Sequence, residues 1–209
     1  MTRRTHILTV LVGVLVLAAT WVAAMAGDIS AIEERLFRTV NDLPDWIEYP
    51  GWPVMQLGSL AAVPILAVGW LVISREWRLP ARLMLAGGTV WVATKVIKTI
   101  VDRGRPGEFL ADINLRPAWN GLGFPSGHTA VAFAIAVILG AALGRRWRIA
   151  IWSVAVVAGL LRIYTAAHFP LDVLGGWGFG AAVGALVELG WSGFSRHSAS
   201  GPTQTAETG

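Results

Sequence analysis

The sequence predicts an all-α, polytopic membrane protein with six transmembrane helices and both termini in the cytoplasm. Two observations carry this fold class. First, 55% of the 209 residues are hydrophobic, only 14% are charged, and the mean hydropathy is +0.59. Second, the apolar residues gather in six runs, each long enough to cross a hydrocarbon core of about 30 Å. Soluble globular domains have neither feature.

The predicted spans follow one another through short connections, and their bounds are approximate. In chain order they are Ile7–Ala26, Val54–Ile73, Leu83–Val101, Ser126–Leu143, Ile149–Ala167 and Leu171–Leu189. Together they form one domain, residues 1–191. The segment 192–209 is rich in Ser, Thr and Gly, so we predict a disordered cytoplasmic tail there.

The first run has two interpretations. The residues MTRR before it and AMAG at its end resemble the flanks of a cleaved signal peptide. Its apolar stretch is closer in length to a complete span, which favours an uncleaved helix. Both interpretations leave the orientation of the later spans unchanged.

Arginine and lysine in the connections predict the orientation of the spans. One set of span ends carries nine basic residues: Arg3, Arg4, Arg75, Arg78, Arg82, Arg145, Arg146, Arg148 and Arg196. The first connection on the other side is acidic, with Asp28, Glu33, Glu34, Asp42, Asp45 and Glu48. The basic side is therefore predicted to be cytoplasmic, in the plasma membrane of a bacterium. Five bases on the outer side need a separate reason: Lys98, Arg103, Arg105, Arg116 and Arg162.

The acidic connection predicts a short helix, because Ile29, Ile32, Leu36 and Val40 have helical spacing. We interpret it as a helix that lies on the outer membrane surface with this face toward the lipid. A lid over a substrate is the alternative.

Small residues mark the sixth run, where glycine recurs every four positions at Gly176, Gly180 and Gly184. Such a stripe permits close approach of helices, and we predict packing within the chain rather than a dimer interface. The chain has no cysteine, which excludes disulfides and thiol catalysis. No basic patch with interleaved aromatic residues occurs, so we expect no nucleic-acid partner.

Three polar clusters lie at the outer ends of predicted spans, and the topology places them on one side of the membrane. They are KTIVDRGRP (Lys98 to Pro106), PSGH (Pro125 to His128) and RIYTAAHFPLD (Arg162 to Asp172). Three of their cations, Lys98, Arg105 and Arg162, have few carboxylates nearby. Cations with few carboxylates nearby at a membrane surface indicate an anionic ligand, and arginine matches phosphate geometry.

The start of the fourth span adds a second kind of anion site. Helix starts present free backbone N–H groups, Gly127 allows a close approach, and Ser126 offers a hydroxyl. The cations and this helix start together predict a phosphate-binding cradle.

Two histidines complete the predicted site. His168 and Asp172 are four residues apart, so the carboxylate can fix the imidazole tautomer and leave the other nitrogen nucleophilic. His128, at the rim of the cradle, can donate a proton to a leaving group. A structural His168–Asp172 pair and a metal site of both histidines with Asp172 are alternatives, although the surrounding cations oppose a metal. Arg103 and Arg116 are predicted to be interfacial anchors.

The pattern Lys98-x6-Arg105-Pro106, Pro125-Ser126-Gly127-His128 and Arg162-x5-His168-x3-Asp172 resembles the type 2 phosphatidic acid phosphatase superfamily. This superfamily includes lipid phosphate phosphatases and, more distantly, vanadium haloperoxidases. The resemblance runs from Lys98 to Asp172, and the six-span plan is similar to that of the membrane branch. One position departs from the pattern, because Leu161 stands where the family usually has serine before the arginine.

The resemblance implies a role for each matched residue. His168 is the expected nucleophile, which forms a phosphohistidine, Asp172 orients it, and His128 is the general acid. The expected phosphate ligands are Lys98, Arg105, Ser126, Gly127 and Arg162. No metal and no other cofactor is implied, because the cations supply the positive charge.

We therefore expect residues 1–191 to form a membrane phosphatase whose site faces the extracytoplasmic side. The expected substrate is a lipid with a terminal phosphate or diphosphate, with polyprenyl diphosphate first. Phosphatidylglycerol phosphate, phosphatidate and polyprenyl-linked phosphosugars are alternatives. A phosphotransferase with the same phosphohistidine stays open, as does an anion transporter without chemistry, which would have no use for the His168–Asp172 pair.

Overall fold

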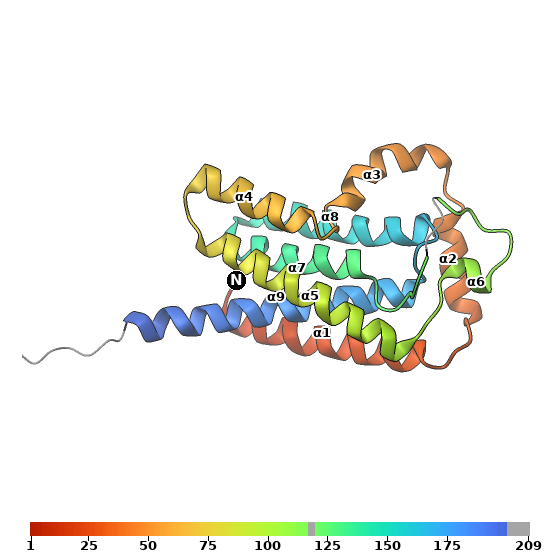
Figure 1. Cartoon of the computed structure of the whole chain (residues 1–209), viewed down its shortest axis with the longest axis horizontal. Coiled ribbons are helices and arrows are strands. Elements are labelled where there is room, and N and C mark those ends of the chain that lie inside the picture. The colour runs from red at the N-terminus through yellow and green to blue at the C-terminus, as the bar shows by residue number, and fades with distance from the viewer. Residues whose placement is uncertain (117–119, 200–209) are drawn as a thin grey trace, which may run out of the picture.

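The computed structural model describes residues 1–116 and 120–199; for residues 194–199 it describes the helical backbone only. All of the secondary structure in this part of the chain is helical (Figure 1). The prediction of an all-α fold is therefore confirmed.

Within the described residues, four helices are long and apolar enough to cross a membrane: α1 (Arg3–Ala24), α5 (Arg78–Val101), α8 (Arg145–Tyr164) and α9 (Pro170–Ala199). Two shorter apolar helices, α4 (Ala62–Ser74) and α7 (Gly127–Ala142), pack among them. This set of helices is that of an integral membrane protein. The number of six spans stays a prediction, because α4 and α7 are shorter than the usual span of about 20 residues.

Helix α7 occupies the centre of the bundle, where it packs against α5, α8 and α9. Every residue from Thr129 to Ile138 is buried. A helix surrounded on all sides has no polar face, which is why this run is apolar throughout. The start of α7 at Gly127 places the PSGH residues at one end of the bundle core.

The glycine stripe of α9 packs against α7, as predicted. A Cβ added at Gly176 would lie 2.6 Å from the carbonyl oxygen of Ser126, and one at Gly180 would overlap the backbone of Ala130. On another face of α9, Gly178 meets Gly13 of α1, with 2.6 Å from the added Cβ to the Gly13 carbonyl oxygen. Glycine at these positions lets the helix backbones touch, so the stripe serves packing within the chain.

The second predicted span, Val54–Ile73, is wrong as a single helix. The chain forms α3 (Glu48–Gln56), turns over residues 57–61 and then forms α4. In this turn Gly58 contacts the backbone of His128, and an added Cβ would lie 2.5 Å from the His128 carbonyl oxygen. Only a residue without a side chain permits this approach. The break therefore depends on a tertiary contact that hydropathy does not report.

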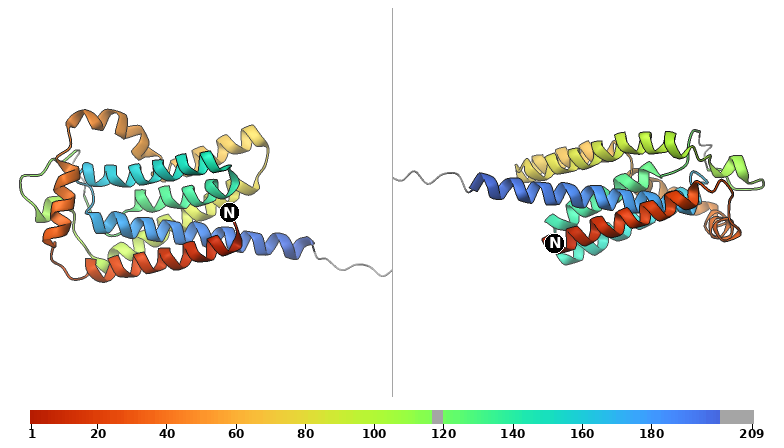
Figure 2. Two further views of the ribbon diagram at one scale, coloured as in Figure 1. Left: turned by 180° about the vertical axis from the view of Figure 1, so that it is seen from behind. Right: turned by 90° about the horizontal axis from the view of Figure 1, so that it is seen from below.

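One end of the bundle is covered by short segments, and we call it the capped end. Helix α2 (Ala31–Asn41) and α6 (Pro106–Phe109) lie there, and the η1 turn (Asp45–Ile47) leads from it into α3 (Figures 1 and 2). The N-terminus and the α4–α5 and α7–α8 connections lie at the opposite end. The α5–α7 and α8–α9 connections reach the capped end, so the three polar clusters meet there.

The predicted helix in the acidic connection exists as α2. Ile32 and Leu36, on the face predicted to lie toward the lipid, are exposed, whereas Glu33, Phe37 and Asn41 on another face are buried against the rest of the chain. Phe37 packs against Phe169, with 5.5 Å between ring centroids. The polar residues on either side of it find buried partners across the capped end, and this satisfaction of polar groups decides which face turns inward.

Helix α9 continues through residues 192–199 to Ala199, so it extends into the segment for which a disordered tail is predicted. Near this point the Trp191 ring packs edge-on against Trp77, and the Ser192 hydroxyl donates to the Leu189 carbonyl. These contacts extend the helix beyond the apolar run. Residues 200–209 of the predicted tail lie outside the described residues.

Candidate active site

A cavity of about 340 Å³ opens where the three polar clusters meet. It contains six of the eight predicted site residues: Lys98, Arg105, Gly127, His128, Arg162 and His168. The rest of its wall is formed by Gly58, Leu60, Trp91, Thr94, Lys95 and Val131. Helices α5, α7 and α8 and the α8–α9 connection thus each contribute predicted residues to one space. The two predicted residues outside the lining, Ser126 and Asp172, are buried behind it.

The start of α7 supplies the part of the cavity nearest to the central helix. The Ser126 N–H donates to the Asp172 carbonyl at 2.9 Å, which ties the start of α7 to the start of α9. A Cβ added at Gly127 would meet no atom closer than 3.5 Å, from Thr94. The space beside Gly127 is therefore open to a ligand, next to the first N–H groups of α7.

Ser126 itself has a different environment from the one predicted. Its hydroxyl oxygen accepts a hydrogen bond from Thr129 at 2.9 Å, and its side chain is fully buried. A ligand in the cavity therefore does not reach this hydroxyl in the described conformation, and contact of Ser126 with phosphate stays a prediction.

Two of the cations are fixed by backbone carbonyls of the connections. The Lys98 ammonium donates to the carbonyls of Leu122 and Gly123, the latter at 2.8 Å. The Arg105 guanidinium donates from Nε to Gly121 at 2.8 Å and from one terminal nitrogen to Ala167 at 2.6 Å. Because carbonyls do not neutralise them, both side chains keep their positive charge for a ligand in the cavity.

Arg162 is almost completely buried, and its guanidinium reaches the cavity from the last turn of α8. One of its terminal nitrogens lies 3.2 Å from the sulfur of Met55 in α3. Leu161, which replaces the serine usual in the resembled family, packs in a buried cluster with Met55 and Tyr164. It also contacts Gly51. An apolar contact with α3 thus stands where the family pattern has a hydroxyl.

His168 lies in the α8–α9 connection with its Nδ1 atom 3.5 Å from Oδ2 of Asp172. The same carboxylate oxygen accepts a hydrogen bond from the Phe169 N–H at 2.9 Å. Because Nδ1 faces Asp172, Nε2 is the ring nitrogen available to the cavity. Burial, followed by the positive charges of Lys98, Arg162, Arg105 and His128, lowers the pKa of His168 well below its usual range. The imidazole is therefore neutral near pH 7, as a nucleophile requires.

Arg103 and Glu33 connect to the predicted site residue Asp172, and the sequence interpretation missed this connection. Arg103 was predicted to be an interfacial anchor, but it is buried and forms ion pairs with Asp172 and Glu33. A signal for Glu33 existed in its spacing: Glu33, Phe37 and Asn41 recur every four residues and define the face that is buried. A buried helix face that includes a carboxylate indicates a partner for that carboxylate within the fold, because charged residues are almost never fully buried unless they are paired.

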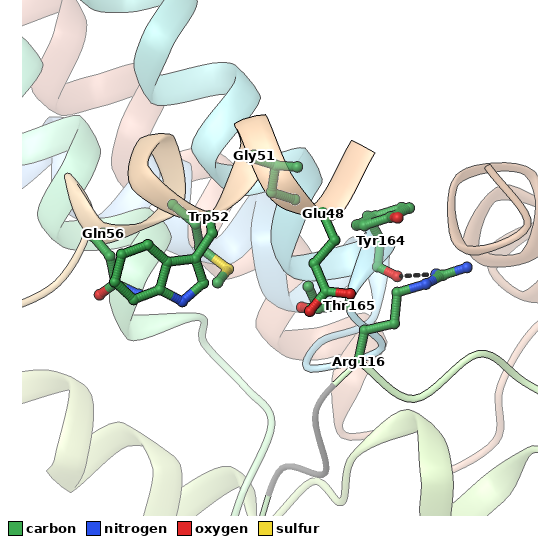
Figure 3. Close-up of a pocket in the computed structure, with 9 residues that line it drawn as sticks. Glu48, Gly51, Trp52, Gln56, Arg116, Tyr164 and Thr165 are labelled. Carbon is green, nitrogen blue, oxygen red and sulfur yellow. Dashed lines mark hydrogen bonds between the residues drawn. The ribbon is translucent and has the colours of Figure 1, made fainter. Parts of the chain in front are cut away.

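The same correction applies to Arg116, which is also buried rather than anchored at the membrane interface. It donates to the carbonyl of Tyr164 at 3.0 Å (Figure 3). It also pairs with Asp45 at 2.7 Å. It lines a small pocket of about 60 Å³ between α3 and the end of α8, together with residues that include Glu48 and Trp52 (Figure 3). None of the eight predicted site residues lines this pocket, whereas six of them line the larger cavity.

Residues 76–194 match the sequence model of the PAP2 superfamily. The chain belongs to the PAP2 superfamily. The matched region contains all eight predicted site residues, which lie between Lys98 and Asp172, but not helix α2 with Glu33. The predicted family is therefore confirmed.

Individual relatives of this PAP2 protein are named as phosphatases. A decaprenylphosphoryl-5-phosphoribose phosphatase of Mycobacterium tuberculosis is 31% identical over 173 residues, which cover 80% of this chain and 88% of the relative. Phosphatidylglycerophosphatase B of Bacillus subtilis is 27% identical, with 68% of this chain and 74% of the relative covered. The crystal structure of Aquifex aeolicus LpxE superposes with a TM-score of 0.71 at 29% identity, covering 78% of this chain and 97% of LpxE. The prediction of a phosphatase of this superfamily is confirmed.

Proposed function

We propose that this PAP2 protein removes a terminal phosphate from a polyprenyl-linked lipid through a phosphohistidine on His168. The observation that carries the proposal is the environment of His168. Its imidazole is neutral, one ring nitrogen faces a buried carboxylate, and the other is left for a cavity that is lined by Lys98, Arg105 and Arg162. Neutral imidazole beside bound phosphate is the arrangement that nucleophilic phosphoryl transfer needs.

The reaction has two steps in this proposal. Nε2 of His168 forms a bond to phosphorus while the bond from phosphorus to the leaving oxygen breaks, and His128 gives that oxygen its proton. Water then attacks phosphorus, the phosphorus–nitrogen bond breaks, and His128 takes the proton of the water. The negative charge of the bound phosphate favours protonated His128 beside the cations.

The cavity cations stabilise the charge that develops on the phosphoryl oxygens. Lys98, Arg105 and Arg162 approach from α5, the α5–α7 connection and α8, so they can surround a phosphate from different directions. Their combined charge serves the purpose of a magnesium ion in other phosphoryl-transfer enzymes. The proposed mechanism therefore uses no metal.

Polyprenyl diphosphate is the first candidate substrate. Lys95 lines the same cavity one helical turn before Lys98, with its ammonium 3.6 Å from the centre of the Trp91 ring. It brings a fourth cation to the cavity, and a second phosphate group would balance that charge. The apolar residues Leu60, Trp91 and Val131 in the wall suit a lipid tail.

A polyprenyl-linked phosphosugar is the second candidate. The observation in its favour is the Mycobacterium tuberculosis relative, which is named for such a substrate and aligns over 80% of this chain. Both candidates share a polyprenyl chain and differ in the group next to the terminal phosphate. Lys95 is therefore expected to matter more for the diphosphate.

Phosphate release by the purified protein in detergent tests the proposal. The panel consists of polyprenyl diphosphate, a polyprenyl-linked phosphosugar, phosphatidylglycerol phosphate and phosphatidate. We expect the highest kcat/KM with a polyprenyl substrate, and Lys95→Ala to lower kcat/KM for the diphosphate about tenfold, the usual size of one charge-assisted contact. No hydrolysis of any member would contradict a hydrolase, and phosphate found on an added lipid acceptor would indicate a phosphotransferase.

A further inference from the structure

A buried network of charged side chains connects helix α2 with the candidate nucleophile. One terminal nitrogen of Arg103 donates to Oδ1 of Asp172 at 2.8 Å, and the other donates to Oε2 of Glu33 at 2.7 Å. The second oxygen of Glu33 accepts the backbone N–H of Leu171 at 3.1 Å, in the first turn of α9. Asp172 is completely buried, and the side chains of Arg103 and Glu33 are each 4% exposed.

The stability of the fold does not by itself explain why these charged side chains are buried. Burial of ions costs desolvation energy, and well-packed apolar residues of similar volume are often as stable or more stable. The two oxygens of the Asp172 carboxylate instead have different partners. Oδ1 is held by Arg103, and Oδ2 faces the Phe169 N–H at 2.9 Å and Nδ1 of His168 at 3.5 Å.

We propose that Arg103 and Glu33 are positioning residues for phosphoryl transfer, which act through Asp172 on His168. This inference rests on the proposed function, in which His168 is the nucleophile. The planar fork of Arg103 fixes the rotation of the Asp172 carboxylate, because its two terminal nitrogens are bound to two different carboxylates. That rotation decides whether Oδ2 meets Nδ1 of His168.

Glu33 also sets how strongly Arg103 attracts Asp172. When Nε2 of His168 bonds to phosphorus, the ring becomes cationic and needs the negative charge of Asp172 beside Nδ1–H. Glu33 balances the charge of Arg103, so the charge of Asp172 stays available to the imidazolium. Without the Glu33 carboxylate, Arg103 would draw on Asp172 alone, and the imidazolium would be less stabilised.

The position of Glu33 connects helix α2 with the proposed catalytic residues. Helix α2 lies outside residues 76–194, the region that matches the superfamily. Its other end is fixed independently, because the buried Asn41 side chain donates to the carbonyls of Asn114 and Tyr164, each at 2.9 Å. Helix α2 is therefore fixed at its C-terminal end, and this helps to keep Glu33 in contact with Arg103.

The test compares Glu33→Gln with Glu34→Gln on the same helix, using a lipid phosphate that the wild-type protein hydrolyses. Glu34 pairs with Arg38 at the surface, with side chains 38% and 37% exposed, so it is a matched control. We expect Glu33→Gln to lower kcat about 10- to 100-fold, the usual range for an outer partner of an active group. KM and the affinity for vanadate should stay within about twofold, because the cradle cations are unchanged. Glu34→Gln should retain wild-type kcat.

Rapid quenching adds a measurement that a purely structural role would not change. The rate at which acid-labile phosphohistidine forms should fall with kcat in Glu33→Gln, while the thermal midpoint stays near that of the wild type. Arg103→Lys keeps the charge but lacks the fork, so it should lose at least as much of this rate.

Several outcomes would overturn the inference. They are wild-type kcat in Glu33→Gln, an equal loss in Glu34→Gln, a rise in KM at unchanged kcat, or loss of the folded state in both Glu33→Gln and Arg103→Lys. A wild-type protein that hydrolyses no lipid phosphate, or His168→Ala with full activity, would instead defeat the proposed function. An active wild type with an unaffected Glu33→Gln defeats this inference alone.

Discussion

Nδ1 of His168 lies 3.5 Å from Oδ2 of Asp172, and neither side chain is open to bulk solvent. At this separation the two groups face each other without a regular hydrogen bond, since an N–H···O hydrogen bond is usually shorter than about 3.2 Å. The Nδ1 atom has no other hydrogen-bond partner within the described part of the chain. A cation that forms on the ring would strengthen the attraction to Asp172, so the geometry suits a group that becomes charged only during the reaction.

Replacement of the two histidines should have different effects. His168→Ala is expected to abolish turnover and phosphohistidine formation, because it removes the bond-forming nitrogen. His128→Ala should reduce kcat by roughly two to four orders of magnitude, the usual contribution of a general acid. Hydrolysis measured beside vanadate binding checks both variants, since a folded cradle still binds vanadate. Wild-type rates in His168→Ala would sink the assignment of the nucleophile.

The low pKa of His168 predicts a pH dependence of stability. The pKa of histidine in the unfolded chain is about 6.5, whereas burial lowers the pKa of His168 in the folded chain. Below a pH of about 6.5 the unfolded state binds a proton that the folded state does not, so the free energy of unfolding falls as the pH falls. The loss approaches about 1.4 kcal/mol per pH unit until the folded pKa is reached.

The comparison that isolates this effect is wild type against His168→Asn. From pH 7.5 to 5.5 the thermal midpoint of the wild type should fall further than that of His168→Asn, followed by tryptophan fluorescence in detergent. Other titrating groups affect both proteins alike. Parallel midpoints across this range would show that His168 is not held neutral by the fold.

Activity should not depend on a divalent metal. The positive charge around the substrate comes from Lys98, Arg105 and Arg162, which a chelator does not remove. We expect kcat to be unchanged after dialysis against EDTA, and vanadate to inhibit because it adopts the five-coordinate shape of the transferring phosphoryl group. Loss of activity in EDTA that magnesium or zinc restores would contradict the proposed mechanism.

Gly58 should control the position of His128. An added Cβ at Gly58 would lie 2.5 Å from the His128 carbonyl oxygen, whereas one at Gly69 in α4 would meet nothing within 4 Å. Gly58→Ala is therefore expected to push the start of α7 away and to lower kcat at least tenfold, a typical result of misplacing a reacting group by a fraction of an ångström. Gly69→Ala should keep wild-type activity. Equal activity of the two variants would show that the contact does not constrain His128.

The contacts that were predicted from the sequence join residues that are close along the chain. His168 and Asp172 are one helical turn apart, and the cluster PSGH begins a helix, so local geometry suffices for both. Glu33 was missed because it meets Leu171 across 138 positions and Arg103 across 70. A carboxylate in an acidic connection resembles any solvated residue until the partner helix is in place.

The same limit explains the errors in the fold. Hydropathy located the apolar runs, but it joined α3 to α4 because it does not report the contact of Gly58 with His128. In α2 it marked only the exposed face with Ile32 and Leu36, and it did not report the face on which hydrogen bonds and ion pairs turn Glu33 and Asn41 inward. Contacts between residues far apart in the sequence decided both cases.

The last prediction concerns the side of the membrane on which the site lies. The α4–α5 and α7–α8 connections share the end opposite to the capped end (Figure 1). Arg75 lies in the first of them, Arg78 begins α5, and Arg145, Arg146 and Arg148 lie in the first turn of α8. Positive residues mark cytoplasmic connections, so the capped end and its cavity are expected to face outward. An enzyme there acts on lipids of the outer leaflet, and a polyprenyl diphosphate left after glycan transfer meets that condition.

Cysteine labelling tests this orientation directly, because the natural chain has no cysteine. Ala111 is exposed at the capped end, and Glu76 is exposed in the α4–α5 connection. A membrane-impermeant maleimide should label Ala111→Cys in intact cells and should label Glu76→Cys only after the cells are opened. Both variants should retain activity, since neither residue lines the cavity. The reverse labelling would place the cavity in the cytoplasm and favour an inner-leaflet substrate such as phosphatidylglycerol phosphate over a recycled polyprenyl carrier.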